Sequence, residues 1–128
     1  MIEIVLATHG NLGQGLYDTV KMVTGTAEDV RLVDLMRDDW RNQLEREIQD
    51  CKGYPLYITD LPLDRPAQEY LKGLKREMTV LTGVNLGMFL EIILSRSYVN
   101  DWEVMEKAVC TAKESIMNMK ERLMEADL

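Results

Sequence analysis

The chain contains few of the residues that bind metals or form disulfide frameworks. Its 128 residues include one histidine, His9, and two cysteines, Cys51 and Cys110. The cysteines lie far apart and have no histidine near them in the sequence, so the ligand spacing of a zinc site is absent. We therefore expect two reduced thiols, no metal site and no cofactor.

Basic residues and long apolar runs are also scarce. Lys and Arg number 15 against 22 Asp and Glu, which gives a net charge of −7 and a pI near 4.7. Such an acidic chain argues against binding to a nucleic-acid backbone. No apolar run is long enough to span a membrane, and the amino terminus lacks the pattern of a signal peptide. We expect a cytoplasmic protein.

The chain does contain short apolar runs that alternate with helical patterns. Strands are expected at residues 2–7, 30–35, 54–59 and 78–81, with helices between them. This alternation predicts an α/β fold, with a doubly wound, mainly parallel sheet of about four strands in the order 2-1-3-4. Helices are expected on both faces of the sheet, and residues 1–128 are expected to form a single domain.

The chain is expected to end in one long helix. Asn100, with Glu103 three residues later, resembles a capping box. Apolar residues then recur in steps of three and four, at Trp102, Met105, Val109, Ala112, Ile116, Met119 and Leu123. We interpret this heptad stripe as the face that the helix lays across the sheet. A helix–helix dimer seam is the alternative.

The candidate site lies where the first strand ends. The strand runs into Thr8 and His9, and a glycine-punctuated turn leads from there into a helical pattern. Asp60 follows the third strand in the same way. In a sheet of order 2-1-3-4 both side chains project into the crevice at the topological switch point, where ligands bind.

This pair of residues suits phosphoryl chemistry. A neutral imidazole can attack phosphorus, provided that one ring nitrogen carries the proton and the other is free. Asp60 is the candidate group that holds the N–H of His9 and stabilises the cation that forms during transfer. Thr8 and the backbone amides that begin at Gly10 and include Gly13 are candidates to bind the phosphoryl oxygens.

Three segments carry a resemblance to a known family. Ile4-Val-Leu-Ala-Thr-His-Gly10 resembles the phosphohistidine segment of the enzyme IIA (EIIA) domains of the mannose/fructose/sorbose class of bacterial sugar phosphotransferase systems. Ile58-Thr-Asp60 resembles the end of their third strand, and Gly83-Val-Asn-Leu-Gly-Met88 resembles the segment before their fourth helix.

The resemblance implies a phosphotransferase subunit that carries phosphate on histidine. Such proteins are cytoplasmic and usually dimeric, and they meet the membrane only through the transporter complex. They accept phosphate from the phosphocarrier HPr and pass it to a IIB domain during carbohydrate uptake. By this resemblance His9 is the phosphorylated residue and Asp60 is its hydrogen-bonded partner.

One segment departs from the family pattern. After the aspartate the family usually has Gly-Gly-Ser-Pro, whereas this chain has Leu63-Asp64-Arg65-Pro66. Leu63 and Asp64 are expected to crowd and repel a phosphoryl group, because they replace glycines whose amides can approach it closely. Arg65 is expected to compensate as a charged donor to the phosphoryl group.

Three alternatives accompany the carrier hypothesis. The altered loop favours a divergent EIIA-like regulatory or protein-binding module without efficient phosphotransfer. A phosphatase or mutase of the His-Gly type needs an arginine before the histidine and a second histidine, so Thr8 and the single histidine argue against it. Gly10, Gly13 and Gly15 have the wrong spacing for a dinucleotide-binding fingerprint.

Overall fold

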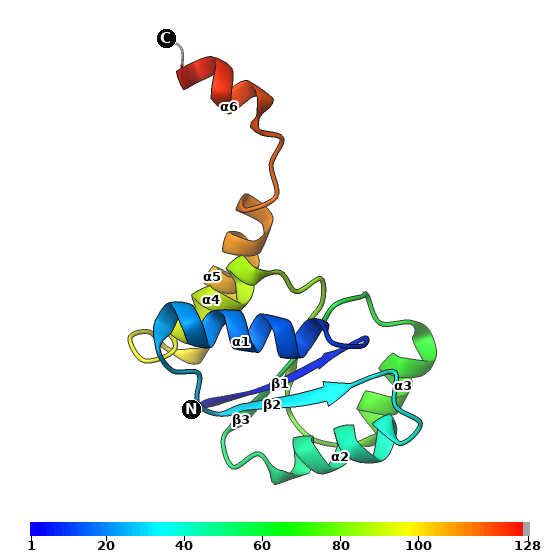
Figure 1. The fold of residues 1–128 in the computed structure, drawn as a ribbon. Helices are drawn as coiled ribbons and strands as arrows, with labels where there is room; N and C mark the ends of the chain where they lie inside the picture. Colours follow the sequence, from blue (N-terminus) through cyan, green and yellow to red (C-terminus); the bar gives the residue numbers. More distant parts are fainter. Residues whose placement is uncertain (127–128) are drawn as a thin grey trace.

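The computed structural model describes residues 1–126, in which strands and helices alternate along the chain (Figure 1). Four strands form the sheet: β1 (Ile2–Thr8), β2 (Val30–Asp34), β3 (Tyr54–Thr59) and β4 (Thr79–Leu81). Neighbouring strands pair in parallel, and their order across the sheet is β2-β1-β3-β4. The predicted parallel sheet and its strand order are confirmed.

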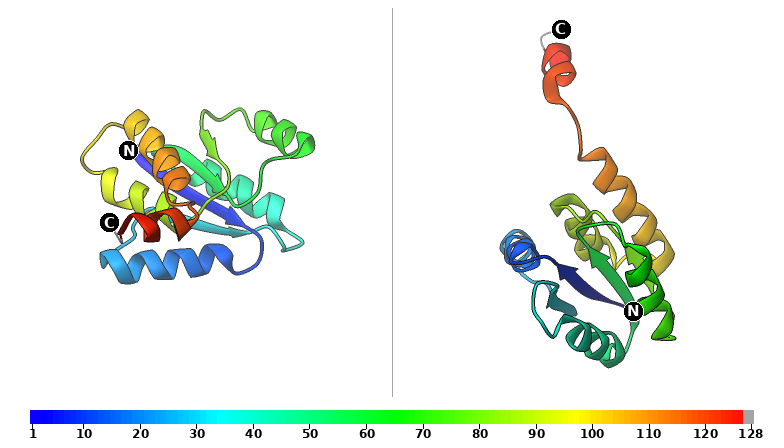
Figure 2. Two further views of the ribbon diagram at one scale, coloured as in Figure 1. Left: turned by 90° about the horizontal axis from the view of Figure 1, so that it is seen from above. Right: turned by 90° about the vertical axis from the view of Figure 1, so that its right-hand side faces the viewer.

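Five helices cover the two faces of the sheet. The helices α1 (Leu12–Thr24), α4 (Leu86–Ser95) and α5 (Asp101–Glu114) share one apolar core with the sheet. The helices α2 (Trp40–Asp50) and α3 (Arg65–Gly73) share the other core. Figures 1 and 2 show these two groups on opposite sides of the strands, as a doubly wound fold requires.

The central strand β1 is buried on both faces because its side chains alternate between the two cores. Ile4 and Leu6 pack in the same cluster as Phe89 of α4. Val5 points to the opposite face and packs in the same cluster as Leu44 of α2. An unbroken apolar run is therefore the sequence pattern of this strand, as expected for a parallel strand with helices on both sides.

The carboxyl-terminal part corrects the sequence-based prediction of one long helix. The structure has two helices, α5 and α6 (Met119–Ala126), separated by residues 115–118. Two polar side chains explain the break. The hydroxyl of Ser115 donates to the carbonyl oxygen of Ala112, and the side chain of Asn118 accepts from the amide of Lys120. Such local hydrogen bonds compete with those of a continuous helix.

The heptad stripe was correct as an inner face only in part, at Ala112, which is buried, and at Met105, which packs against the core. The buried residues of α5 are Val104, Ala108 and Ala112, at steps of four. Trp102 is 69% exposed and Ile116 is 75% exposed. The start of the helix was predicted correctly, because the side chain of Asn100 accepts from the amide of Glu103.

Three further expectations concern membrane-spanning helices, the cysteines and metal sites. Among residues 1–126, no helix is both long enough and apolar enough to cross a membrane. Both cysteines are free thiols: Cys51 is buried and Cys110 is exposed. The described residues contain no group of three or more His, Cys, Asp and Glu side chains that could hold a metal ion.

Candidate functional site

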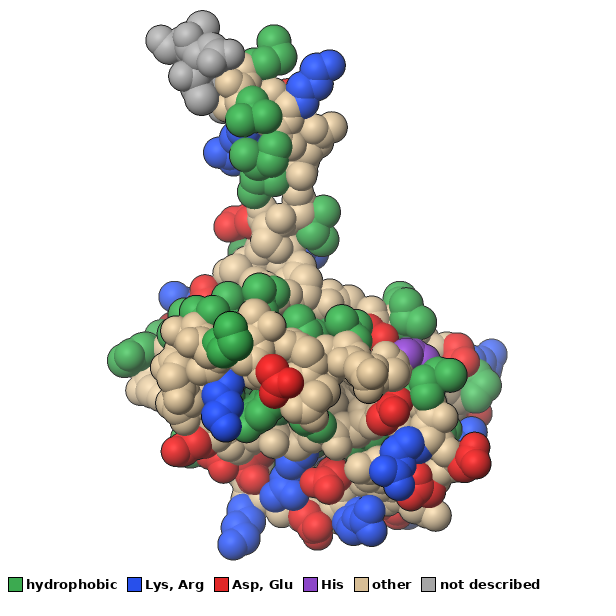
Figure 3. Space-filling model, in the orientation of Figure 1, with side chains coloured by type: hydrophobic (Ala, Val, Ile, Leu, Met, Phe, Trp, Pro, Cys, Tyr) green, Lys and Arg blue, Asp and Glu red, His purple; other side chains and the backbone are tan. Residues whose placement is uncertain are grey.

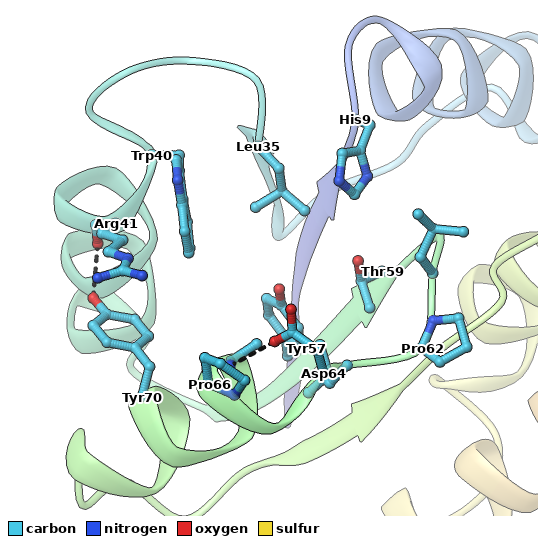
Figure 4. A pocket seen from close by; sticks show the side chains of 13 residues that line it. His9, Leu35, Trp40, Arg41, Tyr57, Thr59, Pro62, Asp64, Pro66 and Tyr70 are labelled. Atoms are coloured by element: carbon cyan, nitrogen blue, oxygen red, sulfur yellow. Dashed lines mark hydrogen bonds between the residues drawn. The ribbon is translucent and has the colours of Figure 1, made fainter.

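Three strands deliver polar side chains to one edge of the sheet. β1 ends at Thr8 and is followed by His9, β2 ends at Asp34, and β3 is followed by Asp60. Parallel strands end on the same side, so these residues meet at the carboxyl edge beside the start of α1. Figure 4 shows the imidazole of His9 at the end of β1, close to Thr59 at the end of β3.

His9 and Asp60, which the sequence predicts to lie together, are in contact in the structure. The Nδ1 atom of His9 lies 3.0 Å from Oδ1 of Asp60 and 3.1 Å from Oδ2. The backbone amide of His9 also donates to Oδ2 of Asp60, at 3.1 Å. One carboxylate therefore holds both the backbone and the ring of His9, which fixes where the imidazole points.

The contact with Asp60 also sets the tautomer of His9. An ionised carboxylate only accepts hydrogen bonds, so Nδ1 must carry the proton and Nε2 is left with a free electron pair. Burial works to raise the pKa of Asp60, but the hydrogen bonds from the amide and ring of His9 outweigh it and hold that pKa below its usual value. The side chain of His9 is 44% exposed, so Nε2 can meet an incoming group (Figure 3).

The turn after β1 is held by hydrogen bonds to its own amides. The hydroxyl oxygen of Thr8 is buried and accepts from the amide of Gly13 at 2.7 Å. Gly10 has a φ of +66°, a conformation that favours glycine. Gly13 has no space for a side chain, because a Cβ there would lie 2.7 Å from Oγ1 of Thr8. Thr8, Gly10 and Gly13 thus shape the turn that carries His9, and their binding of a phosphoryl group stays a prediction.

Asp34 is a residue of the site that the sequence analysis missed. Its Oδ1 atom accepts from the amide of Gly10 at 3.0 Å and from the amide of Met36 at 2.9 Å. Asp34 is the residue that faces Thr8 in the pairing of β1 with β2. The sequence held a usable signal, because a polar residue that ends β2 must lie beside the end of β1 in a 2-1-3-4 sheet.

The first turn of α1 offers free donors next to His9. Among residues 1–126, the amides of Leu12 and Gln14 donate no hydrogen bond, whereas the amide of Gly13 donates to Thr8 and that of Gly15 to the carbonyl of Asn11. Unpaired amides at a helix amino terminus, together with the helix dipole, favour an anion such as a phosphoryl group.

A cavity of about 320 Å³ lies beside His9, between α2 and α3. Its floor is Tyr57 of β3, and its far wall includes Trp40 and Tyr70 (Figure 4). The two aromatic rings meet edge to face, with centroids 6.2 Å apart. The guanidinium of Arg41 lies 5.2 Å from the centre of the Trp40 ring. A mostly apolar hollow next to a reactive side chain suits part of a partner molecule.

The loop that departs from the family pattern forms the near wall of this cavity. Leu61, Pro62, Leu63 and Asp64 all line it. The carboxylate of Asp64 accepts from the amide of Ala67 at 2.9 Å, so Asp64 is the N-cap of α3. Its negative charge, expected to repel a phosphoryl group, is engaged at the start of a helix instead.

Arg65 does not lie with the other predicted site residues. Its Nε atom is 3.4 Å from Oε1 of Glu69, and its side chain is 88% exposed. The residues that line the cavity beside His9 do not include Arg65. To bind a phosphoryl group on His9, Arg65 would have to leave Glu69, and this role stays a prediction.

Comparisons with known proteins point to one class. A family model described as "PTS system fructose IIA component" (EIIA-man) matches residues 3–53, a range that includes His9 and Asp34. The phosphotransferase system component EIIA from Streptococcus agalactiae is 28% identical, with a TM-score of 0.78, over 94% of this chain and 99% of that one.

Two other solved structures share the fold. The PTS IIA protein associated with the fucose utilization operon from Streptococcus pneumoniae is 25% identical, with a TM-score of 0.74, over 95% of this chain and 96% of that one. A putative phosphoenolpyruvate-dependent sugar PTS permease from Klebsiella pneumoniae is 22% identical, with a TM-score of 0.81, over 95% and 93% of the two chains.

The chain is thus similar in fold to EIIA components of sugar phosphotransferase systems. Within that class, the amino-terminal part of this chain matches the mannose/fructose/sorbose type. The resemblance indicated by the sequence motifs is confirmed.

Proposed function

We propose that this protein is a phosphoryl carrier that accepts phosphate from HPr on His9 and passes it to a IIB domain during carbohydrate uptake. The observation that carries the proposal is the bond between Nδ1 of His9 and Asp60, at 3.0 Å, which leaves Nε2 as the exposed nucleophile. The family match and the EIIA fold support the setting in a sugar phosphotransferase system.

The chemical step is a transfer between two nucleophiles. The free electron pair of Nε2 forms a bond to phosphorus, while the bond from phosphorus to the donor breaks and the donor keeps that electron pair. His9 retains its proton on Nδ1, so the ring becomes cationic as the N–P bond forms. Asp60 faces that proton and stabilises the cation. Transfer to the acceptor is the reverse of this step.

The phosphoryl oxygens need donors close to Nε2. The unpaired amides of Leu12 and Gln14 at the start of α1 are the proposed donors, since the amino terminus of a helix favours an anion. Thr8, Gly10 and Gly13 contribute by holding the turn in place, and Arg65 is proposed as a further donor once it leaves Glu69. Both partners are proteins that must reach His9, and the cavity beside it lies where they would dock.

The remaining parts of the proposal concern the setting. The carrier acts in the cytoplasm as a homodimer, contacts the membrane only through its transporter and needs no cofactor. A regulatory or protein-binding module is the second candidate, and the apolar cavity walled by Leu61 and Leu63 favours it. In that case a partner would bind at the same edge of the sheet without receiving phosphate.

Labelling separates the two functions. The protein is mixed with radiolabelled phosphoenolpyruvate, enzyme I and HPr, next to His9→Ala as the matched control. A carrier takes up label that is lost in acid and kept in base, and the His9→Ala variant takes up none. A folded protein that takes no label at any HPr concentration contradicts the carrier function and supports the binding module.

A further inference from the structure

The cavity beside His9 has the size and the lining of a small-molecule site. Its volume of about 320 Å³ lies within the range of ligand pockets, which is about 300–1,000 Å³. Three aromatic side chains, Trp40, Tyr57 and Tyr70, form its floor and far wall (Figure 4). Tyr57 is buried, and the rings of Trp40 and Tyr70 meet edge to face. A flat apolar ligand can therefore pack on rings that are already held in place.

The charges in this lining are not balanced. The charged side chains are Arg41 on α2 and Asp64 at the start of α3. The carboxylate of Asp64 accepts from the amide of Ala67, and the dipole of α3 offsets a negative charge at that position. Among residues 1–126, Arg41 pairs with no carboxylate, whereas Arg37 pairs with Asp39. The cavity thus presents an unpaired cation, which favours an anion.

Aromatic rings hold this cation in place. The guanidinium carbon of Arg41 lies 5.2 Å from the centre of the Trp40 ring and 5.6 Å from the centre of the Tyr70 ring, within the range of a cation–π contact. The hydroxyl of Tyr70 also donates to the backbone carbonyl oxygen of Arg41, at 3.0 Å. Within the described residues the guanidinium donates no hydrogen bond of its own, so its planar fork is available to a carboxylate.

We propose that this cavity binds a small aromatic carboxylate, with the ring of the ligand against Trp40 and Tyr57 and its carboxylate at Arg41. The ring covers apolar surface that is otherwise in water, and the carboxylate pairs with the free cation. His9 lines the same cavity, so the bound ligand lies beside the imidazole. There it blocks the approach of protein partners to His9, a consequence that rests on the proposed function.

Trp40 can report on the ligand directly. The chain has two tryptophans, and the other, Trp102, is 69% exposed on α5, so Trp102→Phe leaves Trp40 as the only indole fluorophore. Phenylacetate is the probe, and phenylacetamide is its matched control, because it has the same ring without the charge. Phenylacetate should change the fluorescence of Trp102→Phe saturably and bind about tenfold more tightly than phenylacetamide.

Two variants of α2 test the contact with the carboxylate. Arg41→Ala, made in the Trp102→Phe background, should weaken the binding of phenylacetate by about tenfold and leave that of phenylacetamide nearly unchanged. Arg46→Ala is the matched control, because Arg46 is exposed on the same helix and does not line the cavity. Equal affinities for the two probes, or equal losses in the two variants, overturn the proposal.

The signal of His9 gives a second, independent readout. His9 is the only histidine of the chain, so its imidazole resonances in NMR need no assignment. Phenylacetate should shift these resonances, and Ala67→Phe, which fills the cavity from α3, should abolish both the shift and the fluorescence change.

Three results contradict the proposal. These are no binding of phenylacetate up to about 10 mM, a fluorescence change without a shift of His9, and undiminished binding in Ala67→Phe. All the measurements use the unphosphorylated protein. They therefore decide whether the cavity is a ligand site independently of whether HPr phosphorylates His9.

Discussion

At the scale of single residues, one carboxylate decides what the histidine can do. Asp60 bonds to both the amide and Nδ1 of His9, so it determines the direction of the ring and the nitrogen that carries the proton. The exposed Nε2 is the consequence of that contact. The chemistry of the site therefore depends on a pair of residues and not on the histidine alone.

Replacing Asp60 by Asn should change the tautomer of His9 and leave the fold intact. The amide can turn its NH₂ group toward Nδ1, which then accepts, and the proton moves to Nε2. We expect transfer to slow by about 10²–10⁴-fold, the usual contribution of a positioned acid–base group. Nitrogen NMR of the imidazole measures the tautomer ratio, and a ratio equal to that of the wild type would remove Asp60 from the mechanism.

Asp34 should matter through the turn that carries His9. Asp34→Ala removes an acceptor for the amides of Gly10 and Met36, and a hydrogen bond to a charged group contributes about 1.5–3 kcal/mol. Asp34→Asn keeps a side-chain oxygen and should recover part of the loss. Urea unfolding gives the stability of each variant, and labelling of His9 should follow the order wild type, Asn, Ala. Equal values for all three would show that Asp34 does not hold the turn.

The sequence could predict His9 and Asp60 but not the partners of the turn. Both residues follow apolar strands, and the order 2-1-3-4 alone places them together. Which amides of residues 9–15 are free depends on the backbone angles of the turn, such as the positive φ of Gly10. Residue spacing does not contain that information. The strand order places Asp34 beside the end of β1, but the amides from which Asp34 accepts could not be predicted.

At the scale of elements, the loop before α3 replaces glycines with a helix cap. The carboxylate of Asp64 accepts from the amide of Ala67, and Pro66 follows near the first position of the helix. Asp64→Ala should therefore lower the free energy of unfolding by about 1 kcal/mol, as loss of an N-cap does. Chemical denaturation measures this, and an unchanged stability would mean that the cap contributes nothing.

Arg65→Ala is the matched variant at the neighbouring position. The pair with Glu69 is exposed, and such pairs contribute about 0–1 kcal/mol, so stability should hardly change. If Arg65 moves to the phosphoryl group as proposed, Arg65→Ala should slow labelling of His9 by about one to two powers of ten, since a charge-assisted bond contributes about 1.5–3 kcal/mol. An unchanged labelling rate would leave Arg65 with Glu69 and outside the site.

The last two helices show where a pattern of apolar residues misleads. The stripe from Trp102 to Leu123 has coiled-coil spacing, yet α5 buries Val104, Ala108 and Ala112, and of these only Ala112 belongs to the stripe. Small alanines let α5 lie close against its neighbours, and Ser115 helps to end it. The periodicity of apolar residues correctly predicted the helix α5. It could not distinguish the helix face that packs on the core from an apolar face that is exposed to solvent.

At the scale of the whole molecule, the parallel sheet was predicted from the sequence. This sheet determines where the helices and the residues of the candidate site lie. Apolar runs identified the strands, and the order 2-1-3-4 was expected because it is common in doubly wound folds. The position of residues 115–126 could not be predicted in the same way. Their apolar residues have the spacing of a helix face that packs on a core, whereas Figure 1 shows α6 standing away from the sheet.

The packed core also predicts how the molecule responds to alkali. Burial, together with the nearby charge of Asp60, raises the pKa of Tyr57 to about 12, whereas tyrosine in an unfolded chain titrates near 10. The folded state thus resists losing this proton, and its stability should fall as pH rises from about 10 to 12, by on the order of 2–3 kcal/mol. Urea unfolding should show a shallower fall in Tyr57→Phe, and identical slopes would contradict the assignment.

The central claim is that His9 carries phosphate on the nitrogen that Asp60 leaves free. The most direct test is NMR of the protein labelled with ¹⁵N-histidine, recorded after phosphorylation with phosphoenolpyruvate, enzyme I and HPr. We predict a phosphorus coupling at Nε2 and a retained proton at Nδ1. Phosphorus on Nδ1, or a folded protein in which His9 never acquires phosphorus, would contradict the account.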